Sequence, residues 1–320
     1  MKTPLPALFF IDRSARGRLR LTGRDRQTFL QGMVSNDIVA LTPGTGCYAF
    51  LLDPTGHVLS DPRVLCAENY LLVDVEPGTA EFVAQTLDKY LIMEKCRITD
   101  VSDQTVQITV GGADVAQALA ALGVGGLDGS VEGANAPGTV GTAGDTLAAS
   151  VRWTVGAVYD LYAPVGECDR LIDALRGLGA TPISEELFEG LRIEAGVPRF
   201  GVDMDSRVLA PETGQQARAI SYRKGCYIGQ EIVARVHARG RVNRSLVGIL
   251  LTPGVLPEAG TPVVFEGTDV GRITSAVHSS TLDLTIALGY IRHEFADLGT
   301  PVTVNGTDAR VAALPFGAAL

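Results

Sequence analysis

The spacing of apolar residues predicts that the first hundred residues combine strands with helices. Two apolar runs, at residues 47–53 and 57–65, flank Pro54-Thr55-Gly56, and a turn sequence between such runs predicts a β-hairpin. Three further runs have the length and composition of strands and lie at residues 8–12, 17–21 and 70–75. Because helical spacing occurs in the same stretch of chain, this part is expected to be mixed α and β.

Helices are predicted where apolar residues recur every three or four positions after a start signal. Thr22, with Asp25 three residues later, resembles a capping box that begins a helix through Leu30. Ser184 is followed by two glutamates and begins a helix that should end near Gly196. Further helices are expected after Pro77-Gly78, near residues 115–122, around residues 171–175 and over residues 230–237.

The second half of the chain changes character twice. Residues 125–144 are rich in glycine and alanine and almost lack large apolar residues, which predicts a flexible loop or an insertion. Beyond about Leu246, short strand-like runs separated by Gly, Pro, Asp and Asn predict a small antiparallel barrel. These runs lie at residues 246–251, 262–265, 270–277, 284–291 and 302–304. We therefore expect an α+β protein with one region over residues 1–245 and a C-terminal β-barrel over residues 246–320.

Charge and apolar run length exclude several classes of protein. No apolar run approaches the roughly 18 residues that a membrane helix requires, so no membrane association is expected. The apolar stretch near the N-terminus ends at Asp12 and Arg13 without a small-residue cleavage site, which favours a strand over a secretion signal. The net charge of −9 argues against a general nucleic-acid-binding protein.

The charge is unevenly distributed along the chain. From Arg218 to Arg244 there are seven basic residues and one acid, Glu231, a local charge of +6 that leaves −15 for the rest. This segment is interpreted either as an anion site or as a solvated basic face.

Cysteine and histidine positions predict neither a disulfide framework nor a metal site. The five cysteines are odd in number and widely spaced, with no C-x-x-C pair, which is typical of a protein of the reducing cytoplasm. The four histidines have no ligand spacing, and no metal is expected. The motifs of nucleotide hydrolysis, Rossmann cofactors, serine hydrolases and zinc proteases do not occur.

Two specific motifs occur in the middle of the chain, and a third pattern lies near its start. The motifs are Gly190-Leu-Arg-Ile-Glu-Ala-Gly-Val-Pro-Arg-Phe-Gly-Val-Asp203 and Lys224-Gly-Cys-Tyr-Ile-Gly-Gln-Glu231. Phe29-Leu-Gln-Gly-Met-Val-Ser-Asn-Asp37 is followed by Gly46-Cys-Tyr-Ala-Phe-Leu-Leu-Asp53. Together they resemble the YgfZ-type folate-binding proteins of iron-sulfur cluster maintenance, relatives of the glycine cleavage T-protein, which is an aminomethyltransferase.

The resemblance implies a T-protein-like fold of several lobes around a central tetrahydrofolate cavity. It also implies support of iron-sulfur cluster assembly or repair, with iron-sulfur proteins or their assembly machinery as partners, and no conventional turnover. In the maintenance branch a cysteine stands where T-proteins have a non-thiol residue, and here that cysteine is Cys226. The paired aspartates of T-proteins correspond to Ser60-Asp61, so one carboxylate is retained.

Particular residues follow from the resemblance and from their chemistry. Glu194 matches the glutamate that contacts the pterin, whose 2-amino-4-oxo edge a carboxylate can bind bidentately, and Arg192 is its candidate partner. Asp61 is the candidate contact of the reactive amines of folate, with a plain turn residue as the other interpretation. Other candidate folate contacts are Arg192, Asn36, Tyr48, Lys224, Tyr227, Gln230 and Glu231 from the matched motifs, and Arg239 from the basic run.

Cys226 is the candidate working thiol. It lies beside Arg223 and Lys224, and positive charge stabilises a thiolate. Glycines flank it in a predicted turn where exposure is expected, whereas the other four cysteines are interpreted as core residues. The basic run through Arg239, Arg241 and Arg244 is a candidate binder of the glutamate tail of folate. The alternatives are a true aminomethyltransferase that uses Asp61 and, less favoured, an RNA-associated factor.

Overall fold

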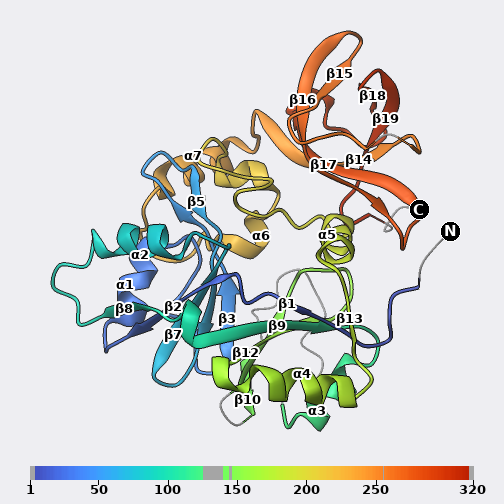
Figure 1. Ribbon diagram of the computed structural model, residues 1–320. Helices are drawn as coiled ribbons and strands as arrows, with labels where there is room; N and C mark the ends of the chain where they lie inside the picture. Colours follow the sequence, from blue (N-terminus) through green and yellow to red (C-terminus); the bar gives the residue numbers. More distant parts are fainter. Residues whose placement is uncertain (1–3, 125–139, 144–145, 255, 317–320) are drawn as a thin grey trace.

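The computed structural model describes residues 4–124, 140–143, 146–254 and 256–316, and its strands form two open sheets and a barrel (Figure 1). The first sheet has the strand order β3-β6-β7-β2-β8. Its strands are β2 Gly17–Thr22, β3 Thr45–Tyr48, β6 Arg63–Cys66, β7 Tyr70–Val75 and β8 Arg97–Asp100. Helices α1 (Arg26–Met33) and α2 (Ala80–Asp88) pack on it and share one apolar core with its strands.

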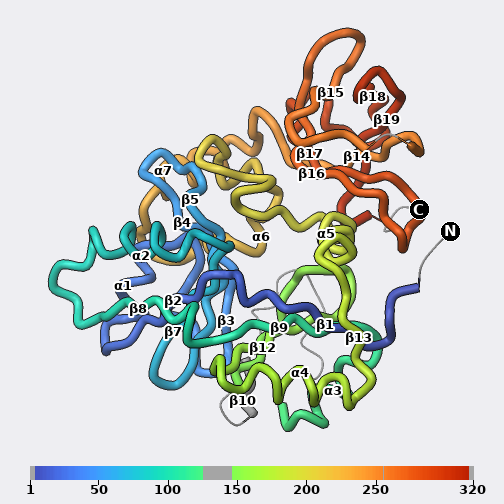
Figure 2. The backbone as a smooth tube through the Cα atoms, viewed as in Figure 1, coloured from blue at the N-terminus to red at the C-terminus, as the bar shows by residue number. Residues whose placement is uncertain are grey.

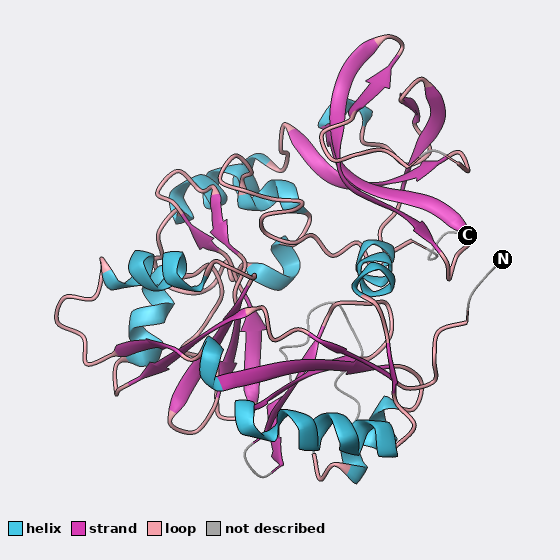
Figure 3. Cartoon of the chain, viewed as in Figure 1, coloured by secondary structure: helices cyan, strands magenta, loops and turns pink. Residues whose placement is uncertain are grey.

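The second sheet has the strand order β10-β11-β12-β9-β1-β13. Its strands are β1 Phe9–Asp12, β9 Thr105–Gly111, β10 Val140–Ala143, β11 Thr146–Val151, β12 Val158–Pro164 and β13 Thr181–Pro182. Helices α3 (Val115–Ala121) and α4 (Cys168–Gly177) cover one face of it (Figure 3). Short 3-10 turns precede β9 and α4, at Ser102–Gln104 and Val165–Glu167.

The two sheets are interleaved along the chain. Strand β1 pairs antiparallel with β9, almost a hundred residues later, whereas the next strand, β2, belongs to the other sheet. The backbone trace shows this crossing from one sheet to the other near the N-terminus (Figure 2). The space between the sheets is therefore lined by residues from distant parts of the sequence.

The predicted hairpin around Pro54-Thr55-Gly56 forms, but in two pieces. Strands β4 (Leu51–Leu52) and β5 (Val58–Ser60) pair next to the turn, and β3 pairs with β6 further out. Between the pieces stands Asp61-Pro62, where proline cannot donate a ladder hydrogen bond. The interruption turns Asp61 out of the regular ladder.

Helix α5 (Glu185–Glu194) lies between the second sheet and the barrel. Its predicted start is confirmed, because the Ser184 hydroxyl accepts a hydrogen bond from the backbone nitrogen of Leu187. A long connection follows, with η3 (Ala210–Thr213), α6 (Gln216–Ala219) and α7 (Gln230–Arg239). Helix α6 lies beside β3, and the start of α7 contacts the turn between β4 and β5.

The C-terminal barrel predicted from the sequence is confirmed. It is a closed antiparallel barrel in the order β14-β17-β16-β15-β18-β19. The strands are β14 Arg244–Leu251, β15 Pro262–Phe265, β16 Thr268–Ser279, β17 Leu284–Arg292, β18 Pro301–Val304 and β19 Thr307–Ala312, with a 3-10 turn at His293–Phe295. The strand β19 has no counterpart in the sequence prediction.

Two local predictions are wrong. The capping box predicted for Thr22 and Asp25 does not form, because Thr22 ends strand β2 and helix α1 begins only at Arg26. The Asp25 carboxylate instead accepts a hydrogen bond from the backbone nitrogen of Lys95. Part of the loop predicted at residues 125–144 is strand β10, and the rest of that loop lies outside the described residues. Among the described helices, none has the length and apolar character needed to cross a membrane.

Candidate functional site

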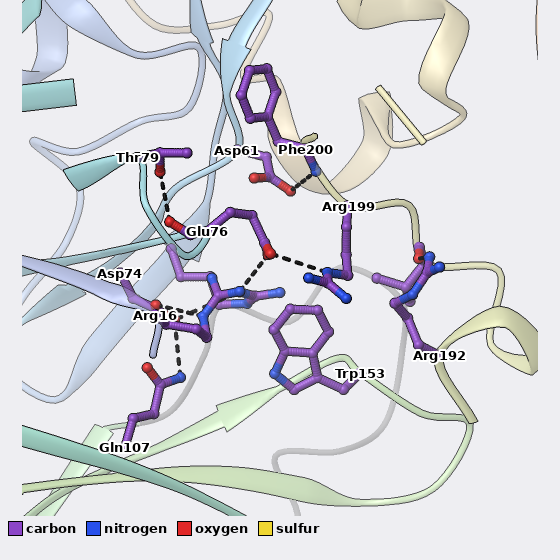
Figure 4. Close-up of polar contacts among 12 residues, drawn as sticks. Arg16, Asp61, Asp74, Glu76, Thr79, Gln107, Trp153, Arg192, Arg199 and Phe200 are labelled. Atoms are coloured by element: carbon purple, nitrogen blue, oxygen red, sulfur yellow. Dashed lines mark hydrogen bonds and ion pairs between the residues drawn. The ribbon is translucent and has the colours of Figure 1, made fainter. Parts of the chain in front are cut away.

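Asp61 is enclosed at the break in the hairpin, with only 2% of its surface exposed. Its Oδ2 accepts a hydrogen bond from the Tyr48 hydroxyl at 3.1 Å. It also accepts one from the backbone nitrogen of Phe200 at 3.4 Å (Figure 4). Its Oδ1 is buried and has no hydrogen-bond partner among the described residues. One oxygen is thus held by the protein, and the other has no partner among the described residues.

The pKa values of two neighbouring carboxylates, Asp61 and Glu76, are shifted in opposite directions. Burial, together with the negative charge of Glu76, raises the pKa of Asp61 to about 7. Burial also opposes ionisation of Glu76, but Arg16 and Arg199 outweigh it and bring the pKa of Glu76 to about 2. Asp61 can therefore carry or release a proton near neutral pH, while Glu76 stays charged.

Arg199 joins this pair to helix α5. Its Nε donates to Glu76 Oε2 at 3.0 Å (Figure 4), and its Nη1 donates to Glu189 Oε2 at 3.1 Å. The next residue, Phe200, supplies the backbone nitrogen that contacts Asp61. The segment after α5 therefore holds both carboxylates in place.

Tyr48 and Asn36 belong to the same cluster in different ways. The Tyr48 ring is buried, and the Arg218 guanidinium lies over it, 4.5 Å from the ring centroid. The Asn36 amide nitrogen donates to the carbonyls of Tyr48 and Arg218, both at 2.8 Å. Tyr48 thus contacts Asp61 directly, and Asn36 joins strand β3 to helix α6.

Glu194 lies at the end of α5, facing the barrel. Its Oε1 accepts hydrogen bonds from the hydroxyls of Ser279 and Thr281, both at 2.5 Å. Its side chain is largely buried, and among the described residues Oε2 has no recorded hydrogen bond. The carboxylate is held by one oxygen, as in Asp61.

The Arg192 side chain makes hydrogen bonds and ion pairs with other residues of the protein. Its guanidinium is fully buried, with Nη1 2.7 Å from Asp203 Oδ2 and further hydrogen bonds to Glu189, Ser275 and the Val197 carbonyl. These contacts fasten α5 to the barrel. Among the described residues, these partners do not include Glu194, so the predicted pairing of Arg192 with Glu194 is wrong. A contact of Arg192 with folate stays a prediction.

Lys224 also makes contacts within the protein. Its Nζ donates to the carbonyls of Gln31, Val34 and Asn36 at 2.5, 2.6 and 2.8 Å. Two of these carbonyls belong to α1 or the residue that ends it, where free carbonyls carry partial negative charge. Burial lowers the pKa of Lys224 to about 8. Lys224 therefore holds the segment before α7 against helix α1 and the residues that follow it.

Cys226 is the exposed thiol among the five free cysteines. Burial raises the pKa of the other four thiols, to about 12 for Cys47. Gly229, three residues later, has φ of +83°, and a Cβ there would lie 2.6 Å from the carbonyl oxygen of Asp53. This close approach fixes the turn that presents Cys226 before α7.

The remaining candidates around α7 differ in exposure. Tyr227 is buried, which raises its pKa to about 12, and Gln230 is half-buried at the start of the helix. Glu231 is exposed and pairs with Arg235 at 2.7 Å, and Arg239 is exposed. Of the predicted tail binders, Arg244 is paired with Glu212 at 2.9 Å. The described residues contain no group of three or more His, Cys, Asp or Glu side chains that could hold a metal.

Sequence reasoning missed Glu76 and Arg199, which the fold brings to the site of Asp61, and Trp153, on whose ring Arg63 lies. Arg199 lies within a motif that the sequence analysis quoted, but its partner Glu76 is 123 residues away. The signal that was available was the arginine itself, a charged residue among apolar neighbours in a specific motif. Glu76 and Trp153 had no local signal.

Comparison with known proteins places this arrangement in a family. A family model described as the GCVT N-terminal domain matches residues 7–224, and the glycine cleavage T-protein C-terminal barrel domain matches residues 244–317. The chain belongs to the glycine cleavage T-protein family. The matches span both open sheets, the candidate site and the barrel.

Relatives of this T-protein-family chain carry transferase names. It is 29% identical over 303 residues to a chloroplastic protein of Arabidopsis thaliana named "Putative transferase". The aligned region covers 92% of this chain and 68% of the Arabidopsis protein. It is 29% identical over 305 residues to an aminomethyltransferase of Rippkaea orientalis, covering 92% of this chain and 81% of the other. The glycine cleavage system aminomethyltransferase T of Bartonella henselae has the same fold, with a TM-score of 0.86 at 21% identity over 97% of this chain and 86% of that one.

Proposed function

We propose that this chain binds tetrahydrofolate beside Asp61 and Glu194 and supports iron-sulfur cluster assembly or repair through Cys226, as a YgfZ-type member of the T-protein family. The observation that carries the proposal is the pairing of a T-protein fold with one exposed thiol. That thiol stands in the motif Lys224-Gly-Cys-Tyr-Ile-Gly-Gln-Glu231, the motif typical of the maintenance branch. A cytoplasmic location and iron-sulfur clients belong to the same proposal.

The residues of the site fit a folate. The buried Asp61 Oδ1 has no partner among the described residues, and an amine of the ligand would satisfy it. Glu194 is held by Ser279 and Thr281 through Oε1, which leaves Oε2 to accept from the pterin edge. Tetrahydrofolate, when bound, supplies amine nitrogens that can carry a one-carbon unit.

Asp61 would donate a proton to these amines or accept one from them. Because its pKa is about 7, the carboxyl is partly protonated at neutral pH, and the Tyr48 hydroxyl orients its Oδ2. Ser60 stands where T-proteins have a second aspartate, so Asp61 is the carboxylate that this pair retains.

Cys226 would act outside this buried cluster. Its exposure allows a partner protein to reach the sulfur, which buried thiols do not permit. One cysteine cannot supply the four ligands of a typical cluster, so the thiol is proposed to act in transfer or protection rather than as a stable cluster site.

The folate half of the proposal is tested by calorimetric titration of tetrahydrofolate into the wild-type protein and Glu194→Ala. We expect saturable binding to the wild type and at least tenfold weaker binding to the variant, since a charge-assisted pair is lost. Glu186→Ala, which removes an exposed glutamate at the other end of the same helix α5, is the matched control and should bind as the wild type does. Absence of binding to the wild type would overturn the folate assignment.

The thiol half is tested in cells that lack this protein, by the activity of an iron-sulfur enzyme. The wild-type gene and Cys168→Ser should restore that activity, and Cys226→Ser should not. Restoration by Cys226→Ser would contradict a working role for this sulfur.

The alternative function is a folate-dependent aminomethyltransferase, which the names of the relatives and the pKa of Asp61 favour. It is tested by methylenetetrahydrofolate formation from an aminomethylated carrier protein. Turnover that survives Cys226→Ser and is lost in Asp61→Asn would establish this alternative. Without turnover in the wild type, the alternative fails.

A further inference from the structure

Three guanidinium groups gather around the indole of Trp153. The Arg63 Cζ lies 3.7 Å from the ring centroid, the Arg13 Cζ 4.8 Å and the Arg16 Cζ 5.0 Å. Trp153 is fully buried, and its Nε1 donates to Asp160 at 3.3 Å. Stacking on an aromatic ring fixes the plane of a guanidinium without using its N–H groups.

Only one of these three arginines is matched by carboxylates at hydrogen-bond distance. Arg16 is paired with Asp74 at 2.8 Å and with Glu76. Asp74 is already satisfied, because it also accepts from Gln107 at 3.3 Å and from the Tyr162 hydroxyl at 3.1 Å. The nearby Asp160 accepts from neutral donors, and burial raises its pKa.

Arg63 and Arg13 are left with unused donors. Arg63 is 5% exposed, and its Nε and Nη1 have no hydrogen-bond partner among the described residues; Nη1 lies 3.6 Å from Asp74 Oδ2. Arg13 is also 5% exposed, its Nη1 has no hydrogen-bond partner, and the described residues give it no ion pair. A buried charged group is costly when its N–H groups have no hydrogen-bond partner. An anion that accepted from the unused donors of Arg63 and Arg13 would remove this cost.

The position of these donors connects them with the proposed ligand site. Arg63 is two residues after Asp61, at the start of β6, and its charge acts on the Asp61 carboxyl. Arg63 also lies 5.8 Å from the Tyr48 ring centroid, and Tyr48 is the residue that contacts Asp61. An anion bound at Arg63 would therefore lie next to whatever occupies Asp61.

We propose that Arg63 and Arg13, stacked on Trp153, form a subsite for a carboxylate group of a ligand beside Asp61. A guanidinium presents its N–H groups in a planar fork that matches a carboxylate, and the indole holds the fork of Arg63 in a fixed plane. The carboxylate has two sources, the glutamate part of a folate or a separate small carboxylic acid. The subsite itself does not depend on folate binding.

The chain contains a single tryptophan, so its fluorescence reports on this place alone. Sodium acetate is titrated against sodium chloride at constant ionic strength while Trp153 emission is recorded. We expect a saturable change with acetate, at a concentration at least tenfold below any change with chloride. No change, or an equal change with both salts, would overturn the subsite.

The arginines are tested by Arg63→Met and Arg13→Met, each of which keeps an apolar stem and removes the fork. Both should abolish the acetate response, and near-ultraviolet circular dichroism identifies a variant that has failed to fold. Arg24→Met changes an arginine whose side chain is 72% exposed and serves as the control that keeps the response. A response retained by both folded variants of Arg63 and Arg13 would contradict the assignment.

Calorimetry then separates the two sources of the carboxylate. The ligands are 5-formyltetrahydrofolate and 6-methyltetrahydropterin, which has no carboxylate, each titrated with and without saturating acetate. If acetate weakens the binding of the folate alone, the subsite belongs to the folate's own glutamate. If acetate weakens the binding of neither ligand, the subsite belongs to a separate acid. Equal weakening of both would place acetate on the pterin position and overturn the proposal. Because the fluorescence titration contains no folate, its result stands apart from failure of the proposed function.

Discussion

The buried cluster around Asp61 and the exposed segment around Cys226 use charge in opposite ways. In the cluster, guanidinium and carboxylate groups are enclosed, and their interactions set the protonation of Asp61 near neutral pH. In the segment from Cys226 through α7, charged side chains such as Arg235 and Arg239 are in water, where charge is screened. The comparison teaches that the first region is built to hold a ligand in a defined electrostatic setting. The second region, from Cys226 through α7, is accessible to molecules in solution.

The largest expected effect comes from breaking the buried ion pair beneath the cluster. Asp74→Asn leaves Arg16 with reduced compensation inside the protein, which should lower the free energy of unfolding by about 3–5 kcal/mol. Urea unfolding measures this loss. The exposed pair Arg207–Asp205 is the control, since Arg207→Gln should leave the free energy of unfolding nearly unchanged. Equal losses in the two variants would abolish the contrast between the regions.

The next effect is the pH dependence that Asp61 imposes on stability. Its pKa of about 7 lies above the 3.8 usual for an aspartate, so the stability that protonated Asp61 contributes is complete below about pH 4 and is lost as the pH rises through 7. Asp61→Asn removes this loss. Relative to the wild type, the variant should therefore gain stability between pH 4 and 8, by up to the order of 4 kcal/mol.

Glu76→Gln sharpens the same measurement with the opposite sign. The pKa of Glu76 is about 2, below its usual 4.5, so its contribution is present above pH 4.5 and is lost as the pH falls through 2. This variant should be destabilised at neutral pH and should lower the pKa of Asp61, because a neighbouring negative charge is removed. An Asp61 titration that does not move would contradict the coupling of the two carboxylates.

These two regions also show what sequence reasoning could and could not predict. The barrel strand Pro262–Phe265 and the N-cap Ser184 follow from local pattern, and both were predicted at the right residues. The contact of Arg199 with Glu76 depends on chain segments that meet only after folding, so no spacing rule indicates it. Burial of Asp61, which sets its pKa, is likewise a property of the assembled lobes.

The hairpin shows the same limit on a smaller scale. Its turn was predicted, but the interruption at Asp61-Pro62 was not, although the proline was visible in the sequence. The exposure of Cys226 was predicted correctly from its flanking glycines, because a turn with such residues is a local feature. Features set within a few residues were therefore accessible, and those set by long-range charge were not.

A smaller effect on stability, and a clear one on reactivity, is expected at Cys226. Cys226→Ser should change the free energy of unfolding by less than about 0.5 kcal/mol, as is usual for an exposed residue. In the wild type, iodoacetamide should modify this cysteine roughly ten times faster than any other, because burial protects the remaining thiols and raises their pKa values. Mass spectrometry of the first modified peptide shows which cysteine reacts first. Labelling of Cys66 or Cys96 before Cys226 would contradict the prediction that Cys226 is the reactive thiol.

The smallest effect is expected on the surface of α7. Glu231→Gln removes the pair with Arg235 one helical turn away, which should cost about 0.3–0.5 kcal/mol at low salt and less at high salt. Thermal unfolding at two salt concentrations measures this difference. A loss above about 1 kcal/mol would mean that the charges of this helix are coupled in the way those of the buried cluster are.

The separation of ligand binding from thiol chemistry is tested most directly by one crossed measurement on Cys226→Ser. Its affinity for tetrahydrofolate is measured by calorimetry beside its ability to restore iron-sulfur enzyme activity in cells that lack the protein. The account predicts an affinity within about twofold of the wild type, the range expected for a change outside the ligand site, and no restoration of activity. A Cys226→Ser protein that loses tetrahydrofolate, or one that restores the enzyme in full, would contradict it.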